Sequence, residues 1–139
     1  MHNCLAPEVS PKTMCLLIFA HQPGTELPLV VAANRDEFHA RPTAPSAFWQ
    51  DRPELFAGRD LEAGGTWMGI SRGGRFAAIT NFRDPDQTVP APRSRGELPL
   101  QFLCDDRPIE KFLGDISPLA SQYAGFNLLL GSGDEMWHL

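Results

Sequence analysis

Two segments decide the expected fold: Cys15-Leu16-Leu17-Ile18-Phe19-Ala20, which directly follows Met14, and Leu29-Val30-Val31-Ala32-Ala33. Both are apolar runs of strand length, which is typical of buried strands, and a short buried helix is the minor alternative for the first. Pro23-Gly24-Thr25 lies between them and predicts a turn. Two buried strands joined by a short polar segment predict an antiparallel pair.

Downstream of this pair, the sequence predicts further strands separated by turns. We expect the proline-rich stretch 40–54 to be irregular, with Phe48 and Trp49 holding it to the core. Segment 64–70 predicts a turn followed by a strand. Gly73-Gly74 predicts a hairpin turn, and residues 75–82 predict the next strand.

Helices are expected after a proline-rich loop over 84–93. Ser94-Arg95-Gly96-Glu97 has the form of a capping box and predicts a short helix that ends near Cys104. Residues 109–123 have amphipathic spacing, and Pro118 is expected to break them into two helical pieces, with Ser117 capping the second. Strands at 126–131 and 136–139 around a hairpin turn complete the pattern. This order predicts an α+β domain with mainly antiparallel sheets.

Composition excludes several classes of function. The chain has 139 residues and a formal net charge of −5, without the clustered Lys and Arg that nucleic-acid binding requires, so no nucleic-acid partner is expected. No apolar run approaches the ~20 residues that cross a bilayer, so no integral membrane segment is expected. The 3 cysteines and 4 histidines have neither disulfide nor metal-site spacing. We therefore expect no metal and no cofactor.

The first residues do not resemble a targeting signal. Residues 1–13 lack the basic start and apolar stretch of a secretory signal, which predicts a cytoplasmic location. Because the composition changes at Met14, we expect residues 1–13 to be an unstructured leader or, preferably, the product of a misassigned translation start. Residues 14–139 are expected to be the N-terminal part of a single domain.

Cys15 becomes the N-terminal residue if translation starts at Met14 and that methionine is removed. Its thiol then shares one residue with an unblocked α-amine, whose pKa of about 7.7–8.0 leaves a usable neutral fraction at neutral pH. Such an amine can act as the general base for the thiol. The alternative is a small buried apolar residue, as reduced cysteines often are.

Polar residues directly follow two of the expected strands. Asn34, Arg35, Asp36 and Glu37 follow the second strand, and Asn81 lies at the end of a later one. Arg35 can favour the thiolate, Asp36 can orient the amine, and the Asn81 amide can donate to a developing oxyanion. The alternatives are a solvated turn with a surface ion pair, and a strand-end turn residue for Asn81.

Ordered motifs run from Met14 to the end of the chain: Met14-Cys15-Leu16-Leu17-Ile18, Ala32-Ala33-Asn34-Arg35-Asp36-Glu37-Phe38 with Arg41-Pro42, Gly64-Gly65-Thr66-Trp67-Met68-Gly69, the segment 75–83, Ser94-Arg95-Gly96 and Gly125-Phe126-Asn127-Leu128-Leu129. Together they resemble the NRDE-motif family, also called the Transport and Golgi Organization protein 2 family. Several motifs in one order make this resemblance specific.

The resemblance implies an N-terminal nucleophile hydrolase-like fold, an αββα sandwich. Because the family is longer than this chain, we expect the sandwich to be incomplete at its C-terminus. Relatives of that fold, such as bile-salt and penicillin-V acylases, use a cysteine to cut non-peptide amides, so the implied substrate is a small-molecule amide.

By analogy, the functional residues of these acylases carry over onto matching positions of this sequence. The resemblance implies Cys15 as nucleophile, Arg35 and Asp36 beside it, and Asn81 as oxyanion donor. Neighbouring residues of an extended chain point to opposite faces, so Glu37 is an alternative to Asp36. The candidate substrate-binding residues are Asn34, Glu37 and Trp67. Residues 1–13, if retained, would turn the Cys15 amine into an amide, which is not a base.

A non-catalytic role remains as the second hypothesis, since animal members of the family are linked to secretory-pathway organisation and to haem or lipid handling. The ligand would then be haem or a lipid such as an acyl-CoA. An apolar pocket would be lined by aromatic residues, namely Trp49, Trp67, Phe38 and Phe56. His21 or His39 would be the axial ligand of a haem. The simpler interpretation of these aromatic residues is an ordinary core.

Overall fold

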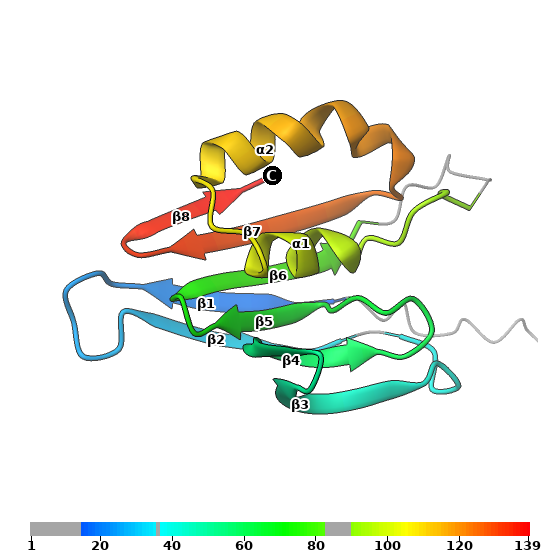
Figure 1. Cartoon of the computed structure of the whole chain (residues 1–139), viewed down its shortest axis with the longest axis horizontal. Helices are drawn as coiled ribbons and strands as arrows, with labels where there is room; N and C mark the ends of the chain where they lie inside the picture. Colours follow the sequence, from blue (N-terminus) through cyan, green and yellow to red (C-terminus); the bar gives the residue numbers. More distant parts are fainter. Residues whose placement is uncertain (1–14, 36, 83–89) are drawn as a thin grey trace, which may run out of the picture.

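Strands β3 to β8 form one antiparallel sheet at the centre of the structure (Figure 1). The computed structural model describes residues 15–35, 37–82 and 90–139. Sheet order follows the sequence: β3 (Thr43–Trp49), β4 (Arg52–Asp60), β5 (Met68–Ser71), β6 (Arg75–Asn81), β7 (Phe126–Ser132) and β8 (Glu135–His138). The helical elements between β6 and β7 are α1 (Glu97–Leu103), α2 (Ile109–Ile116) and the 3-10 helix η1 (Ser117–Gln122). A separate antiparallel pair consists of β1 (Leu17–His21) and β2 (Leu29–Ala33).

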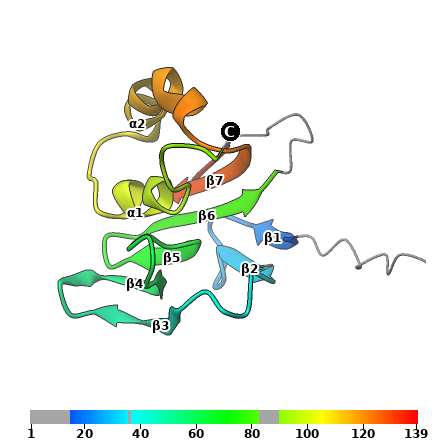
Figure 2. The same cartoon turned by 90° about the vertical axis from the view of Figure 1, so that its right-hand side faces the viewer.

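The helices cover one face of the large sheet (Figure 2). Phe102 of α1 and Phe112 of α2 meet edge to face, with ring centres 5.2 Å apart. They pack in one cluster with Leu128 and Leu130 of β7. None of the helices in the described segments is long and apolar enough to cross a membrane.

The β1–β2 pair packs on the opposite face of the large sheet (Figure 2). Its inward side chains contact a second, smaller cluster on the sheet; the residues involved are Leu17, Leu29 and Val31 from the pair and Phe76, Ala78 and Leu129 from the sheet. Among the described residues, no backbone hydrogen bond joins the pair to the large sheet. Packing between side chains therefore holds the two sheets face to face.

Strand β6 contacts the helices with one face and the β1–β2 pair with the other. Ala77 faces the helical cluster, whereas the next residue, Ala78, faces the β1–β2 pair, as the alternation of side chains along a strand requires. Both are almost completely buried, with exposed fractions of 0% and 1%. The layers are thus helices, a large sheet and a small sheet.

The expected α+β class and mainly antiparallel pairing are confirmed. The predicted hairpin turns connect β5 to β6 and β7 to β8. Gly74 and Gly133 in these turns have φ angles of 81° and 58°, a backbone region that favours glycine.

The expectation that 40–54 is irregular is wrong, because this stretch contains β3 and the start of β4. Prolines are tolerated in edge strands and at bulges. β3 is an edge strand, and its register with β4 shifts between Ala44 and Ala47, on either side of Pro45. Trp49 is buried as expected, but Phe48 is 48% exposed, because neighbouring residues of a strand face opposite sides.

Both expected side-chain caps are absent. The residue before α1 is Gly96, with no side-chain cap, and the Glu97 carboxylate instead pairs with Arg93 at 2.5 Å. Ser117 begins η1 directly after α2 ends, so it has no role as a side-chain cap. The break near Pro118 occurs as predicted, since proline is tolerated only in the first turn of a helix.

Tyr123 is the only tyrosine of the chain and is 6% exposed. Burial raises the pKa of its hydroxyl to about 12, and a hydrogen bond to the Glu97 carboxylate acts in the same direction. A pKa raised in the folded state favours folding below the unfolded value of 10.0, and this contribution is lost as the pH rises toward 12.

We expect Tyr123 to ionise at a pH of about 12 in the folded chain and near its ordinary value in denaturant. The ultraviolet absorbance of tyrosinate reports this residue alone. Glu97→Gln should lower the folded-state pKa, because it removes the neighbouring negative charge. Ionisation of the folded chain at the ordinary tyrosine pKa would contradict the buried contact.

Candidate functional site

A cavity of about 500 Å³ lies where the β1–β2 pair meets the large sheet. The residues that line it include six of the seven predicted for the site: Cys15, Asn34, Arg35, Glu37, Trp67 and Asn81. The other predicted residue, Asp36, lies outside the described residues. The fold thus brings together residues from four separate segments: the segment before β1, the segment after β2, the segment before β5 and the end of β6.

Asn34 fixes the position of the chain next to Cys15. The backbone N–H of Leu16 donates to Oδ1 of Asn34 at 2.7 Å, and the N–H of Asn34 donates to the carbonyl of Leu16 at 3.1 Å. These two bonds extend the β1–β2 pairing by one step beyond the strands. Cys15 is therefore held at the end of a paired segment, with its side chain at the cavity wall.

Cys15 also borders a second, smaller cleft of about 280 Å³. This cleft is lined mainly by apolar side chains, among them Leu17, Phe19 and Leu129. The thiol thus lies between a cavity with many charged residues and an apolar cleft.

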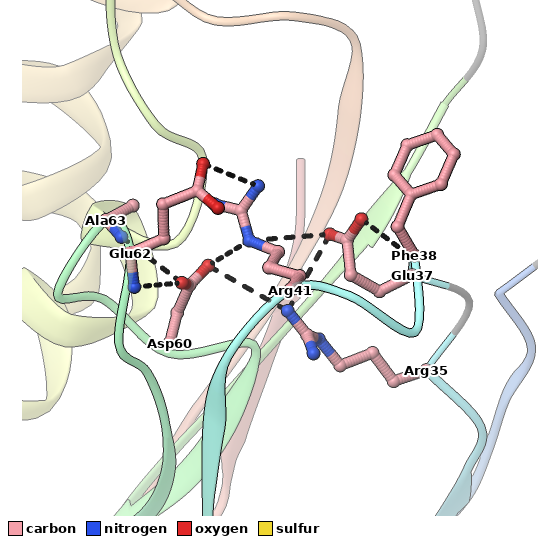
Figure 3. Close-up of polar contacts among 7 residues, drawn as sticks. All are labelled: Arg35, Glu37, Phe38, Arg41, Asp60, Glu62 and Ala63. Carbon is pink, nitrogen blue, oxygen red and sulfur yellow. Dashed lines mark hydrogen bonds and ion pairs between the residues drawn. The ribbon is translucent and has the colours of Figure 1, made fainter.

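Asp60, at the end of β4, is the centre of a network of charged side chains (Figure 3). Arg41 Nε donates to its Oδ2 at 2.8 Å, and Arg35 Nη2 lies 3.8 Å from the same oxygen. The backbone N–H groups of Glu62 and Ala63 donate to Oδ1 at 3.0 and 3.2 Å. Burial alone would raise the pKa of Asp60, but these hydrogen bonds lower it overall, so the carboxylate stays ionised.

Glu37 joins the same network from the segment after β2 (Figure 3). Its Oε2 lies 3.6 Å from Arg35 Nη2 and 3.8 Å from Arg41 Nε, and its Oε1 accepts a hydrogen bond from the N–H of Phe38 at 2.9 Å. The positive charges of Arg35 and Arg41 are thus matched by carboxylates. Arg35 and Arg41 each lie within ion-pair distance of both Glu37 and Asp60.

Trp67 is positioned by the absence of a side chain at Gly58. A Cβ on Gly58 would lie 2.5 Å from two ring atoms of Trp67, which is closer than packed carbons approach. The Arg35 guanidinium lies over the same indole, 4.2 Å from the ring centre. Gly58, Trp67 and Arg35 therefore depend on one another for their positions.

A second close approach places Arg95 at the cavity. A Cβ on Gly65 would lie 2.5 Å from the backbone of Gly96, and the N–H of Thr66 donates to the carbonyl of Gly96 at 3.0 Å. The Ser94-Arg95-Gly96 segment is thereby fixed against the Gly64-Gly65-Thr66-Trp67 segment. Arg95 Nη1 donates to the carbonyl of Gly125 at 2.9 Å, and the residue lines the cavity.

Asn81 lies at the end of β6, opposite Phe126 of β7. It is exposed and lines the cavity, as does its neighbour Thr80. The Thr80 hydroxyl accepts a hydrogen bond from Asn127 Nδ2 at 3.3 Å. An amide at this position can donate an N–H to a group in the cavity.

Sequence reasoning did not select Arg41, Asp60 or Arg95 as site residues. Arg41 and Arg95 belong to the motifs quoted for the resemblance, so a closer reading of those motifs could have found them. Asp60 ends a strand, as Asn34 follows one, but its strand lies partly in a stretch predicted to be irregular. The burial of Asp60, with 8% of its surface exposed, is a tertiary property.

The aromatic pocket of the second hypothesis is not assembled. Trp67 lines the cavity, whereas Trp49 is buried in the helical cluster and Phe38 is 83% exposed. Phe56 lies on the surface of the large sheet, edge to face with Phe48. His21 and His39 are not among the residues that line the cavity. In the parts of the chain that the structure describes, no group of three or more His, Cys, Asp or Glu side chains is arranged to hold a metal ion.

Residues 14–139 match the sequence profile of the family described as Transport and Golgi organisation 2. This chain belongs to that family. The resemblance inferred from the motifs is confirmed, and the profile match begins at Met14, directly before the cysteine at the cavity wall.

Animal relatives are similar over most of the chain. The Transport and Golgi organization 2 homolog of Mus musculus is 40% identical over 123 residues, which cover 84% of this chain and 44% of the mouse protein. The corresponding protein of Homo sapiens is also 40% identical, with the same shares. The Transport and Golgi organization protein 2 of Drosophila melanogaster is 40% identical over 73 residues, which cover 48% of this chain and 25% of the fly protein. The chain thus spans less than half the length of the mouse and human relatives.

Gly58→Ala should lower the free energy of unfolding by about 1–3 kcal/mol, because the added methyl group collides with the Trp67 ring. Gly114→Ala is the matched control. A Cβ there meets open space within α2, so we expect a gain of about 0.5–1 kcal/mol from the better helix former. Urea unfolding of both variants measures the difference, and equal stabilities would contradict the close contact.

Asp60→Asn should lower the free energy of unfolding by about 1–3 kcal/mol, because charge-assisted hydrogen bonds are lost in a buried position. The pKa of Asp60 is lower in the folded state than in the unfolded state. Its carboxylate therefore contributes to the free energy of unfolding above the ordinary Asp pKa, and this contribution is lost as the pH falls through the folded-state pKa. The difference from wild type should therefore shrink in acid. Asp51→Asn, which disrupts an exposed pair with Arg59, should have no measurable effect. Equal losses in the two variants would argue against a special role of Asp60.

Proposed function

We propose that the protein is an amidohydrolase of the N-terminal nucleophile type, with Cys15 as the nucleophile and a small-molecule amide as substrate. The observation that carries this proposal is the shared cavity: Cys15, Asn81 and Arg35 come from separate segments and line one concave site. A site of about 500 Å³ has the size of a pocket for a small molecule.

The proposed base is the α-amine of Cys15, exposed when residues 1–14 are absent from the mature chain. The start of the family match at Met14 supports this, since removal of that methionine leaves Cys15 first. An α-amine has a pKa of about 7.7–8.0 and can accept the thiol proton at neutral pH. The hydrogen bonds between Leu16 and Asn34 would hold this new terminus in place.

In the first half of the reaction, Cys15 Sγ forms a bond to the amide carbonyl carbon while its proton passes to the α-amine. The C–N bond then breaks, and the resulting ammonium returns the proton to the leaving nitrogen. In the second half, water attacks the thioester, the α-amine takes a proton from that water, and the C–S bond breaks. The carboxylic acid departs and the thiol regains its proton.

The remaining predicted residues take supporting roles in this proposal. Asn81 would donate to the oxyanion that develops at the carbonyl. Arg35 would favour the thiolate by its positive charge. Asp36 would orient the amine, and Glu37, which lies close to both Arg35 and Arg41 at the cavity, is the alternative for this role.

The proposed fold is the αββα sandwich of N-terminal nucleophile hydrolases. Helices, a large sheet and a small sheet are arranged in the order that three of those layers require. The outer side of the β1–β2 pair leaves Leu16, Ile18 and Val30 about half exposed, with fractions of 57%, 61% and 49%. These apolar side chains are where a further layer would pack.

Binding of a lipid without turnover is the second candidate. The apolar cleft beside Cys15 favours it, since Leu17, Phe19 and Leu129 can contact an acyl chain. A cytoplasmic location also remains a prediction.

Intact-mass spectrometry with a β-lactone tests the hydrolase. A chain starting at Met14, with the methionine removed, should gain one acyl group on Cys15, and Cys15→Ala should gain none. Asn81→Ala should slow acylation by about 10²–10³, as the loss of an oxyanion donor does. Cys104→Ala is the control, because Cys104 is exposed and does not line the cavity. An unmodified Cys15 with an unblocked amine would contradict the hydrolase and leave lipid binding.

A further inference from the structure

Arg95 differs from the other arginines of the cavity. The lining arginines in the described part of the chain are Arg35, Arg41, Arg93 and Arg95. Arg35 and Arg41 lie within 4 Å of carboxylates in the Asp60 network, and Arg93 pairs with Glu97 at 2.5 Å. For Arg95, no carboxylate of the described residues lies within ion-pair distance, and one N–H donates to a neutral carbonyl, that of Gly125.

The guanidinium of Arg95 has more N–H donors than the one hydrogen bond to the Gly125 carbonyl uses. A guanidinium carries several N–H groups in a planar fork that fits an oxyanion with two parallel hydrogen bonds. Arg95 is half-buried, and burial lowers its pKa, which attraction to Glu37 and Cys15 only partly offsets. A buried charge without a matching partner is costly unless a ligand supplies one.

The backbone holds this charge rigidly. Gly96 lies against Gly65 and accepts a hydrogen bond from the N–H of Thr66, so a shift of the segment that carries Arg95 would disturb both contacts. A preorganised donor loses little entropy when it binds, which favours recognition.

We propose that Arg95 is the oxyanion-recognition residue of the Cys15 cavity, so that the ligand carries a carboxylate or phosphate group. This inference rests on the proposed function in taking the cavity as the substrate site. It adds a substrate class, an acylated amine with an anionic substituent, and a residue that selects for it.

The test is equilibrium binding, measured by calorimetry on the full chain carrying Cys15→Ser so that no turnover occurs. The probes are N-hexanoylglycine, its uncharged amide N-hexanoylglycinamide, and the phosphate monoester of N-hexanoylethanolamine. We expect at least one anionic probe to bind about tenfold or more tightly than the amide, as a charge-assisted hydrogen-bond pair predicts. The two anionic probes distinguish carboxylate from phosphate. Equal affinities for all probes, or no binding by any, would overturn the proposal.

Two variants test whether Arg95 is the residue that causes the tighter binding of the anionic probe. Arg95→Gln should abolish the preference for the anion, and Arg95→Lys should keep part of it, since the charge remains but the fork is lost. Arg59→Gln is the matched control, because Arg59 pairs with Asp51 and stacks on Trp49 outside the cavity. A preference that survives Arg95→Gln would overturn the proposal.

A readout on the unmutated arginine covers the case in which Arg95→Gln does not fold. The Nε–H resonance of Arg95 should shift when the preferred anionic probe is added, and an unchanged resonance would overturn the proposal. Acylation of Cys15 is measured separately. Anion binding through Arg95 without any acylation would reject the hydrolase and keep this inference.

Discussion

The charge on Asp60 is the constraint on which the site depends. A carboxylate at the end of β4, largely removed from water, needs hydrogen-bond donors and opposite charges. From the segment that follows β2, Arg41 donates a hydrogen bond to it and Arg35 lies within ion-pair distance. Because no backbone hydrogen bond among the described residues joins the two sheets, these ion pairs complement the apolar contacts between the layers. They also position Glu37, which shares the same two arginines. The charged wall of the cavity is thus a consequence of satisfying one buried group.

Two glycines shape the site because they have no Cβ. Gly58 leaves room for the Trp67 ring, and Gly65 lets the backbone at Gly96 approach. The second contact joins the segment before β5 to the segment that carries Arg95, one of the arginines that line the cavity. The sequence predicts a turn at the start of segment 64–70, and Gly64 does have a φ angle of 77°. At Gly65 the decisive property is instead the lack of a Cβ, which only the neighbouring chain reveals.

The sequence was informative where a local rule decides the structure. Apolar runs predict β1 and β2, and paired glycines predict the hairpin turn before β6. The residues selected next to strands, among them Cys15, Arg35 and Asn81, line one cavity. It failed where a distant contact outweighs the local rule. Pro45 is compatible with a strand because β3 is at an edge. Ser94 does not cap α1 because the helix begins only at Glu97, so that Gly96 is the residue before its first turn. Asp60 and Arg95 could not be ranked from sequence, since their importance comes from burial and from which charges lie nearby.

Within the described residues, no backbone hydrogen bonds join the two sheets, so the width of the Cys15 cavity is set by contacts between side chains. Tilting the β1–β2 pair away from β6 would break individually weak dispersion contacts among Leu17, Val31 and Phe76, while the ion pair of Arg35 with Asp60 resists the movement at the end of β2. On the other side of the cavity, Asp60 ends β4 and Trp67 directly precedes β5, and backbone hydrogen bonds join these two strands. Ligands of different width could therefore be accommodated by small displacements of the β1–β2 pair. The wall that carries Asp60 and Trp67 would keep its shape.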